Sequence, residues 1–138
     1  LITSITTIIP TQTGTHKLSQ TINLPLSTKR IISVEALMLQ SNDDNIAEEH
    51  IPIFLTIKPD DRQEISLIVP YPLIKIYSGN DKLDFTPFAL YLNVVKKTLN
   101  ITEFNSTIKI LTESPRARIS ETYVMVVIDL EISEGRAY

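Results

Sequence analysis

The amino-acid sequence predicts an all-β fold, an antiparallel β-sandwich of jelly-roll type with about eight strands. Isoleucine, threonine and valine are abundant, and their β-branched side chains suit a pleated sheet better than a helix. Short runs of alternating apolar and polar residues are separated by proline, glycine, asparagine and aspartate. The chain of 138 residues has the size of one domain, so we expect a single sandwich over residues 1–138.

Residues 121–132 form the clearest strand pattern and are expected to lie at the centre of a sheet. The even positions from Val124 to Ile132 are all aliphatic, so they share one face of a strand. The opposite face carries Tyr123, Met125 and Val127 and then becomes polar. We therefore expect the first half of this strand to be covered on both faces and the second half on one.

The other expected strands are shorter and are bounded by turn residues. Residues 30–40 have a strand pattern with Ile32, Val34, Ala36 and Met38 on one face, but alanine, leucine and methionine also favour helices, so a helix is the alternative there. The remaining strands are predicted at 1–9, 16–24, 51–58, 64–69, 73–77 and 107–112.

One segment, 87–99, has the pattern of a short helix. Thr86 is a helix-capping residue, Pro87 would occupy the first helical position, and Lys96 and Lys97 would lie in the last turn, where the helix dipole favours cations. Apolar residues recur at helical spacing, at Phe88, Leu92, Val95 and Leu99. The alternative is a strand, which Tyr91, Val94 and Val95 favour.

No pattern of catalytic or metal-binding residues is present. The chain has no cysteine, and His16 and His50 are too far apart in sequence for a local zinc motif. There is no nucleophile elbow, phosphate-binding loop or glycine-rich dinucleotide turn. We therefore predict a non-enzymatic protein with no catalytic residue, no cofactor and no bound metal.

Charge and hydropathy narrow the possible partners further. The formal net charge of −3 and the short basic clusters, Lys96-Lys97 and Arg116/Arg118, argue against nucleic-acid binding. No apolar run reaches the roughly 18 residues of a membrane span. The acidic run 41–50 and the residues Asn80, Asp81 and Asp84 are expected to form a solvated loop and a turn.

Two features bear on processing. Asn100 and Asn105 each begin a match to the N-glycosylation acceptor pattern, which is a weak signal in a chain rich in serine and threonine. The chain begins at Leu1 instead of methionine, so we expect either a processed N-terminus or a numbering that omits a leader.

The N-terminal stretch is unusually apolar for an exposed segment and is the candidate interface. It contains Ile2, Ile5, Ile8 and Ile9 and ends at Pro10. One interpretation is an extended arm, residues 1–10, that adds a strand to a neighbouring subunit. The other is an ordinary first strand at the edge of the chain's own sheet.

These observations predict a structural protein that packs against copies of itself or against other structural proteins, and we expect a homo-oligomer. The class that fits best is a virion component, such as a capsid, decoration or minor structural protein. The alternative is a carbohydrate- or protein-binding module of an adhesin, located outside the cell or on its surface. That module would use Tyr71, Tyr77 or the 78–84 turn as the rim of a ligand site.

Overall fold

The computed structural model describes residues 1–11, 14, 16–40, 52–70, 94–115 and 122–133. These residues form strands and connecting turns, with no helix among them, which confirms the all-β prediction. The described residues form eight strands: β1 (Ile2–Thr11), β2 (Lys17–Asn23), β3 (Thr28–Gln40), β4 (Ile53–Asp60), β5 (Gln63–Val69), β6 (Val95–Ile101), β7 (Thr107–Glu113) and β8 (Thr122–Ile132).

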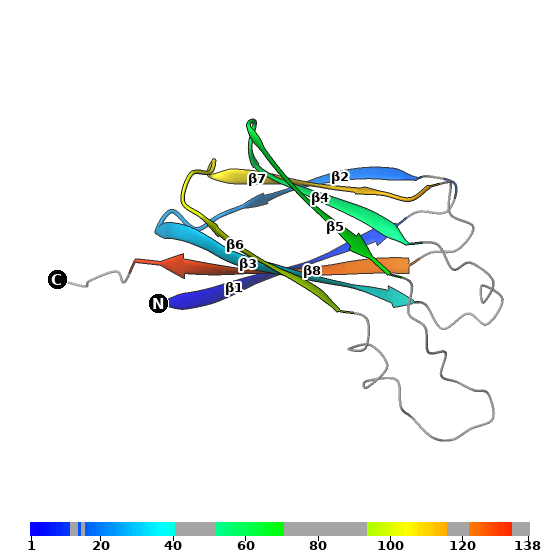
Figure 1. Cartoon of the computed structure of the whole chain (residues 1–138), viewed down its shortest axis with the longest axis horizontal. Coiled ribbons are helices and arrows are strands. Elements are labelled where there is room, and N and C mark those ends of the chain that lie inside the picture. Colours follow the sequence, from blue (N-terminus) through cyan, green and yellow to red (C-terminus); the bar gives the residue numbers. More distant parts are fainter. Residues whose placement is uncertain (12–13, 15, 41–51, 71–93, 116–121, 134–138) are drawn as a thin grey trace, which may run out of the picture.

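The strands form two antiparallel sheets that face each other (Figure 1). Sheet A has the order β1-β8-β3-β6, and sheet B has the order β2-β7-β4-β5. Aliphatic side chains from both sheets fill the space between them, including Ile53, Leu55 and Ile57 from β4. The two-layer sandwich therefore has one hydrophobic core.

The order of the strands is that of a jelly roll, as the sequence predicted. The first strand pairs with the last, β2 with β7, β3 with β6 and β4 with β5, all antiparallel. The chain is thus one long antiparallel ribbon that turns back between β4 and β5. Pairing of β3 with β8 and of β4 with β7 then joins the parts of this ribbon into two sheets.

Strand β8 lies inside sheet A, between β1 and β3, as expected of a central strand. Its inward residues Val124, Val126, Ile128 and Leu130 are at most 1% exposed. The expectation that its first half is covered on both faces is wrong. The outward residues from Tyr123 to Glu131 are all half-buried, so the first half of the strand is no better covered on this face than the second.

The predicted helix at 87–99 is wrong from residue 95 onward, where the chain forms β6 and pairs with β3. Residues 87–93 lie outside the described part. The error has a simple cause, because a spacing of four residues puts Val95 and Leu99 on one face of a strand as well as of a helix. The spacing of the apolar residues therefore does not distinguish a helix from a strand. The segment forms a strand because its backbone bonds to β3. Residues 30–40 likewise belong to a strand, β3, and not to the alternative helix.

The turn between β4 and β5 is organised by Asp60. One carboxylate oxygen accepts a hydrogen bond from the Arg62 backbone N–H at 2.8 Å, and the other accepts one from Nε2 of Gln63 at 3.0 Å. The same Gln63 nitrogen donates to the backbone carbonyl of Glu103 at 2.6 Å. These bonds favour the charged carboxylate, so the pKa of Asp60 lies below its ordinary value of 3.8, chiefly because of Gln63.

Leu130→Ala is expected to lower the free energy of unfolding by about 2–5 kcal/mol, because it leaves a cavity between the sheets. Leu130 is fully buried, whereas Ile68 on β5 is 58% exposed. The matched control Ile68→Ala is therefore expected to cost less than about 1 kcal/mol. Chemical denaturation measures both, and equal losses would contradict the two-layer arrangement.

The hydrogen bonds of Asp60 predict that the stability of this turn depends on pH. The folded-state pKa of Asp60 is lower than its unfolded value, so the turn gains stability from the ionised carboxylate above the unfolded pKa. That contribution is lost as the pH falls through the folded-state pKa. A carboxyl NMR titration should give a pKa below 3.8 for Asp60, and Gln63→Ala should raise it. An unchanged value in the variant would refute the assigned cause.

Candidate functional site

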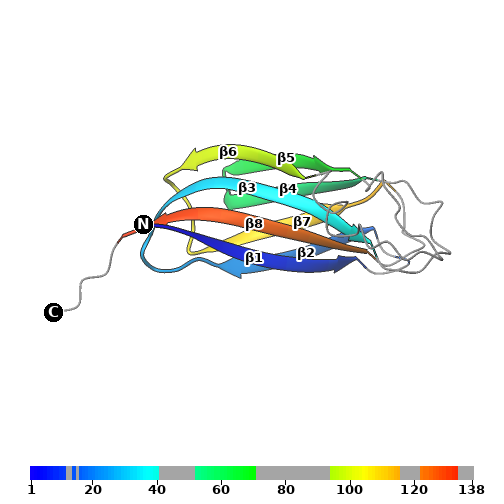
Figure 2. The ribbon, with the colours of Figure 1, turned by 90° about the horizontal axis from the view of Figure 1, so that it is seen from below.

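The most unusual surface of the described structure is the free edge of β1. This strand lies at one end of sheet A, and no other strand in the described ranges pairs with its outer side. Figure 2 shows β1 along one long side of the sandwich, with β2 of sheet B on the same side. An exposed sheet edge of this kind can accept another strand through its backbone.

The hydrogen bond between the Ile132 N–H and the Leu1 carbonyl, 2.9 Å, shows which residues of β1 face outward. In an antiparallel pair, alternate residues direct both backbone groups toward the partner. Because β1 pairs with β8 without a register shift, the odd-numbered residues bond to β8. Ile2, Ser4, Thr6, Ile8 and Pro10 therefore turn their backbone groups to the open side.

Pro10 fits this assignment, because a proline has no N–H to contribute to a ladder. It is tolerated where that side of the strand faces solvent. The outer edge of β1 thus offers amide donors at Ile2, Ser4, Thr6 and Ile8, and its ladder-forming part ends at Pro10. The sequence placed this proline at the end of the N-terminal run, but only the pairing with β8 shows which edge it faces.

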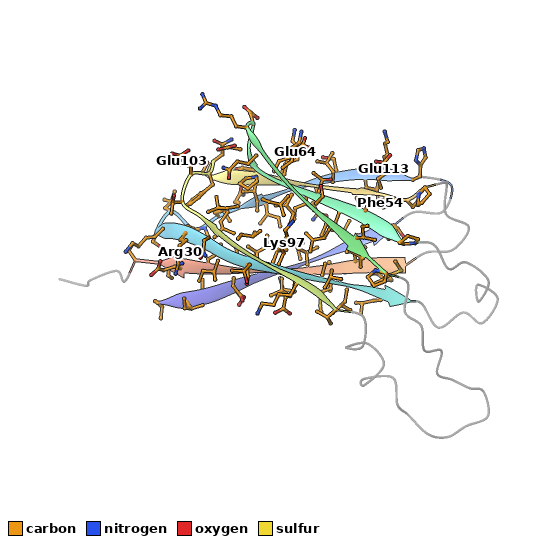
Figure 3. The ribbon with its side chains drawn as sticks, in the orientation of Figure 1. Arg30, Phe54, Glu64, Lys97, Glu103 and Glu113 are labelled. Atoms are coloured by element: carbon orange, nitrogen blue, oxygen red, sulfur yellow. The ribbon has the colours of Figure 1, made fainter. Side chains whose placement is uncertain are left out.

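Charge also distinguishes β1 from the other three edge strands. Residues 1–11 contain no charged side chain, whereas β2 carries Lys17, β5 carries Glu64 and β6 carries Lys96 and Lys97. Lys97 lies opposite the buried Val34, so an exposed charge stands on the inward side of that edge (Figure 3). Charges on an edge strand oppose the addition of another strand. Only β1 lacks this protection among the described edges.

The four predicted interface residues divide between the two sides of β1. Ile9 is buried in the core and Ile5 packs against it, whereas Ile2 is 59% exposed and Ile8 is 50% exposed. The first pair therefore stabilises the chain's own sandwich. The second pair lies on the outward face, where Ile2 is level with Glu131 and Ile8 with Met125.

Polar side chains on the outward face of sheet A attach β1 firmly to its sheet. The Asp129 carboxylate accepts a hydrogen bond from Ser4 on β1 at 2.7 Å and one from Ser33 on β3 at 3.1 Å. In the next row, Arg30 forms an ion pair with Glu131 at 3.0 Å and donates to the Asn100 side-chain oxygen at 2.7 Å. These rows link all four strands of sheet A.

A second candidate surface is a shallow groove of about 340 Å³ on the outward face of sheet B. Its apolar lining comes from Phe54, which is 40% exposed, and from Leu18 and Leu111. The ion pairs Lys17–Glu113, at 3.5 Å, and Lys58–Glu64, at 3.3 Å, lie on the same face (Figure 3). This groove was not predicted from the sequence, although Phe54 is out of phase with the apolar Ile53 and Leu55, which are buried.

The structure describes one of the two histidines, His16. His16 is exposed at the mouth of a cavity of about 10 Å³, which is large enough for about one water molecule. No group of three or more His, Cys, Asp or Glu in the described ranges could hold a metal ion. The described residues also contain no helix that is long and apolar enough to cross a membrane.

Several predicted features lie outside the described residues. They are the strand at 73–77, the acidic loop 41–50, the turn at 78–84, His50, and the proposed ligand-rim residues Tyr71 and Tyr77.

No protein-family model matches the chain, and no curated protein matches it either.

The direction of the β1 backbone groups predicts a difference between two neighbouring proline substitutions. Thr7→Pro removes an N–H that bonds to β8, whereas Thr6→Pro removes one that faces the open edge. Thr7→Pro should therefore lower the free energy of unfolding by about 1–3 kcal/mol more than Thr6→Pro. Denaturant unfolding of dilute protein measures the difference, and a larger loss for Thr6→Pro would reverse the assignment of the edge.

Proposed function

We propose that this protein is a non-enzymatic structural protein that assembles with copies of itself, and that the assembly is a virion. The observation that supports this most directly is the uncharged edge of β1, which exposes backbone donors and acceptors as well as Ile2 and Ile8. Folded monomers usually protect such an edge, since it can recruit further strands. A protein whose working state is an assembly gains from leaving it open.

The fold is compatible with this proposal. Jelly rolls are common in viral capsid proteins, but lectin domains and cupins also use them. The fold alone therefore does not decide between these classes. The capsid-type role is favoured because β1 provides an open edge without a charged side chain, whereas the cavity lined by His16 holds only about one water molecule.

A second candidate function is a carbohydrate- or protein-binding module on the cell surface or outside the cell. The groove on sheet B favours it, because an exposed aromatic ring beside charged side chains can stack on a sugar and bond to its hydroxyl groups. On this alternative, Phe54 would be the central contact, and the chain would work without self-association.

Sedimentation velocity over a wide range of protein concentrations tests the main proposal. We expect reversible association into a discrete oligomer that dissociates on dilution and keeps the circular dichroism spectrum of a β-protein. Leu130→Ala serves as the control, because aggregation through unfolding would increase in this destabilised variant whereas native assembly would not.

A monomer at every soluble concentration would refute the assembly proposal. If that monomer also bound an oligosaccharide on a glycan array, and Phe54→Ala removed the binding, the second candidate function would replace it.

A further inference from the structure

We propose that two copies of this chain pair β1 with β1 in antiparallel orientation, around a two-fold axis beside Ile5, with Ile2 opposite Ile8 and Ser4 opposite Thr6. The proposal rests on the proposed function in one respect, which is that the partner is a second copy. It adds the surface, the symmetry and the register. The two copies of sheet A would then form one continuous sheet.

The two-fold symmetry follows from the use of one strand by both copies. A contact between identical surfaces is isologous, so each residue pair occurs twice. In an antiparallel pair of identical strands, the outward donors and acceptors of one copy face those of the other. Since residues 1–11 carry no charged side chain, the two edges approach without repulsion between like charges.

The register follows from the position of Pro10 and from the positions of the two exposed isoleucines, Ile2 and Ile8. The outward donors run from Ile2 to Ile8, and Pro10 supplies none. If Ile2 faces Ile8, all of these residues find a partner. If the register is shifted by two residues so that Ile2 lies opposite Pro10, one hydrogen bond between the strands is lost, because Pro10 has no N–H. A shift in the other direction places Ile2 opposite Thr6, so the two exposed isoleucines, Ile2 and Ile8, no longer pack against each other.

The same register buries the most exposed apolar side chains of β1. Ile2 and Ile8 are 59% and 50% exposed, and both lie on the outward face of sheet A. With a two-fold axis perpendicular to the sheet, Ile2 of each copy packs against Ile8 of the other on that face. On the inward face, Ile5 would face its own counterpart, and Thr3 would face Thr7.

A second copy is a better occupant of this edge than a charged partner strand. The strand offers no charged side chain that could select such a partner, and its apolar residues match each other in the self-paired register. The other edge strands are less suited, because the side chains of Lys17, Glu64 and Lys96 are each more than half exposed. Pairing of two such edges would desolvate these charges.

Cysteine cross-linking tests the register directly, because the chain has no cysteine of its own. Ile5 would face its counterpart at a non-hydrogen-bonded position, where the two Cα atoms are about 4.5 Å apart and a disulfide is possible. We expect Ile5→Cys to form covalent dimers in good yield under mild oxidation. Ile5→Ser is the matched control for any loss of stability.

Two further variants define the register by a mixing experiment. Thr3→Cys and Thr7→Cys should each remain uncross-linked alone, because neither residue faces itself across the axis. An equimolar mixture of the two should form the mixed disulfide dimer. Cross-linking of Thr7→Cys alone, or absence of the mixed dimer, would overturn the proposed register.

Thr6→Pro provides a test that needs no cysteine. It removes an outward donor and keeps the bonds to β8, so the variant should fold and its dimer dissociation constant should rise at least about tenfold. Association that Thr6→Pro leaves unchanged, without cross-linking of Ile5→Cys, would overturn the β1 contact but not the proposed assembly. A wild-type chain that never associates would overturn both.

Discussion

The packing of β8 between β1 and β3 is the interaction on which the rest of the structure depends. Its inward side chains, Val124, Val126, Ile128 and Leu130, supply a continuous apolar row at the middle of the core. Its two edges provide the hydrogen-bonding partners for both neighbours. Because β8 is the last strand and β1 the first, this pairing also brings the two ends of the jelly-roll ribbon together.

The position of β1 follows from this arrangement. It is held on one side by β8 and by the Ser4–Asp129 hydrogen bond, and its other side has no strand beside it in the described structure. The side of β1 that bonds to β8 is therefore the structural side, and the opposite side is the one that we propose pairs with another chain. The division of the isoleucines follows the same logic, with Ile5 and Ile9 serving the core and Ile2 and Ile8 remaining exposed.

The distribution of charge gives the edges different properties. Along β2, β5 and β6, lysine or glutamate side chains keep the edge hydrated, and several of them are held in ion pairs such as Lys58–Glu64. The outward face of sheet A uses its charges differently, in cross-strand rows that bind the strands to one another. An uncharged β1 is the exception, and this contrast supports the proposed assembly more strongly than apolar composition alone.

The sequence alone identified most of the strands, because an alternation of period two is a local property that each segment carries by itself. It therefore predicted the all-β class, the central role of β8 and the apolar character of β1. It failed for β6, since Val95 and Leu99 are spaced four residues apart and fit both a helix and a strand. A local pattern cannot reveal that the free edge of β3 will recruit that segment.

Only the tertiary structure decided which residues of β1 face outward, because that depends on the register with β8, formed by residues more than a hundred positions away. The same holds for the groove around Phe54 and for the contrast between the four sheet edges. Local alternation of side chains determined that this chain forms strands. Long-range hydrogen bonding decided which strand was left with an open edge.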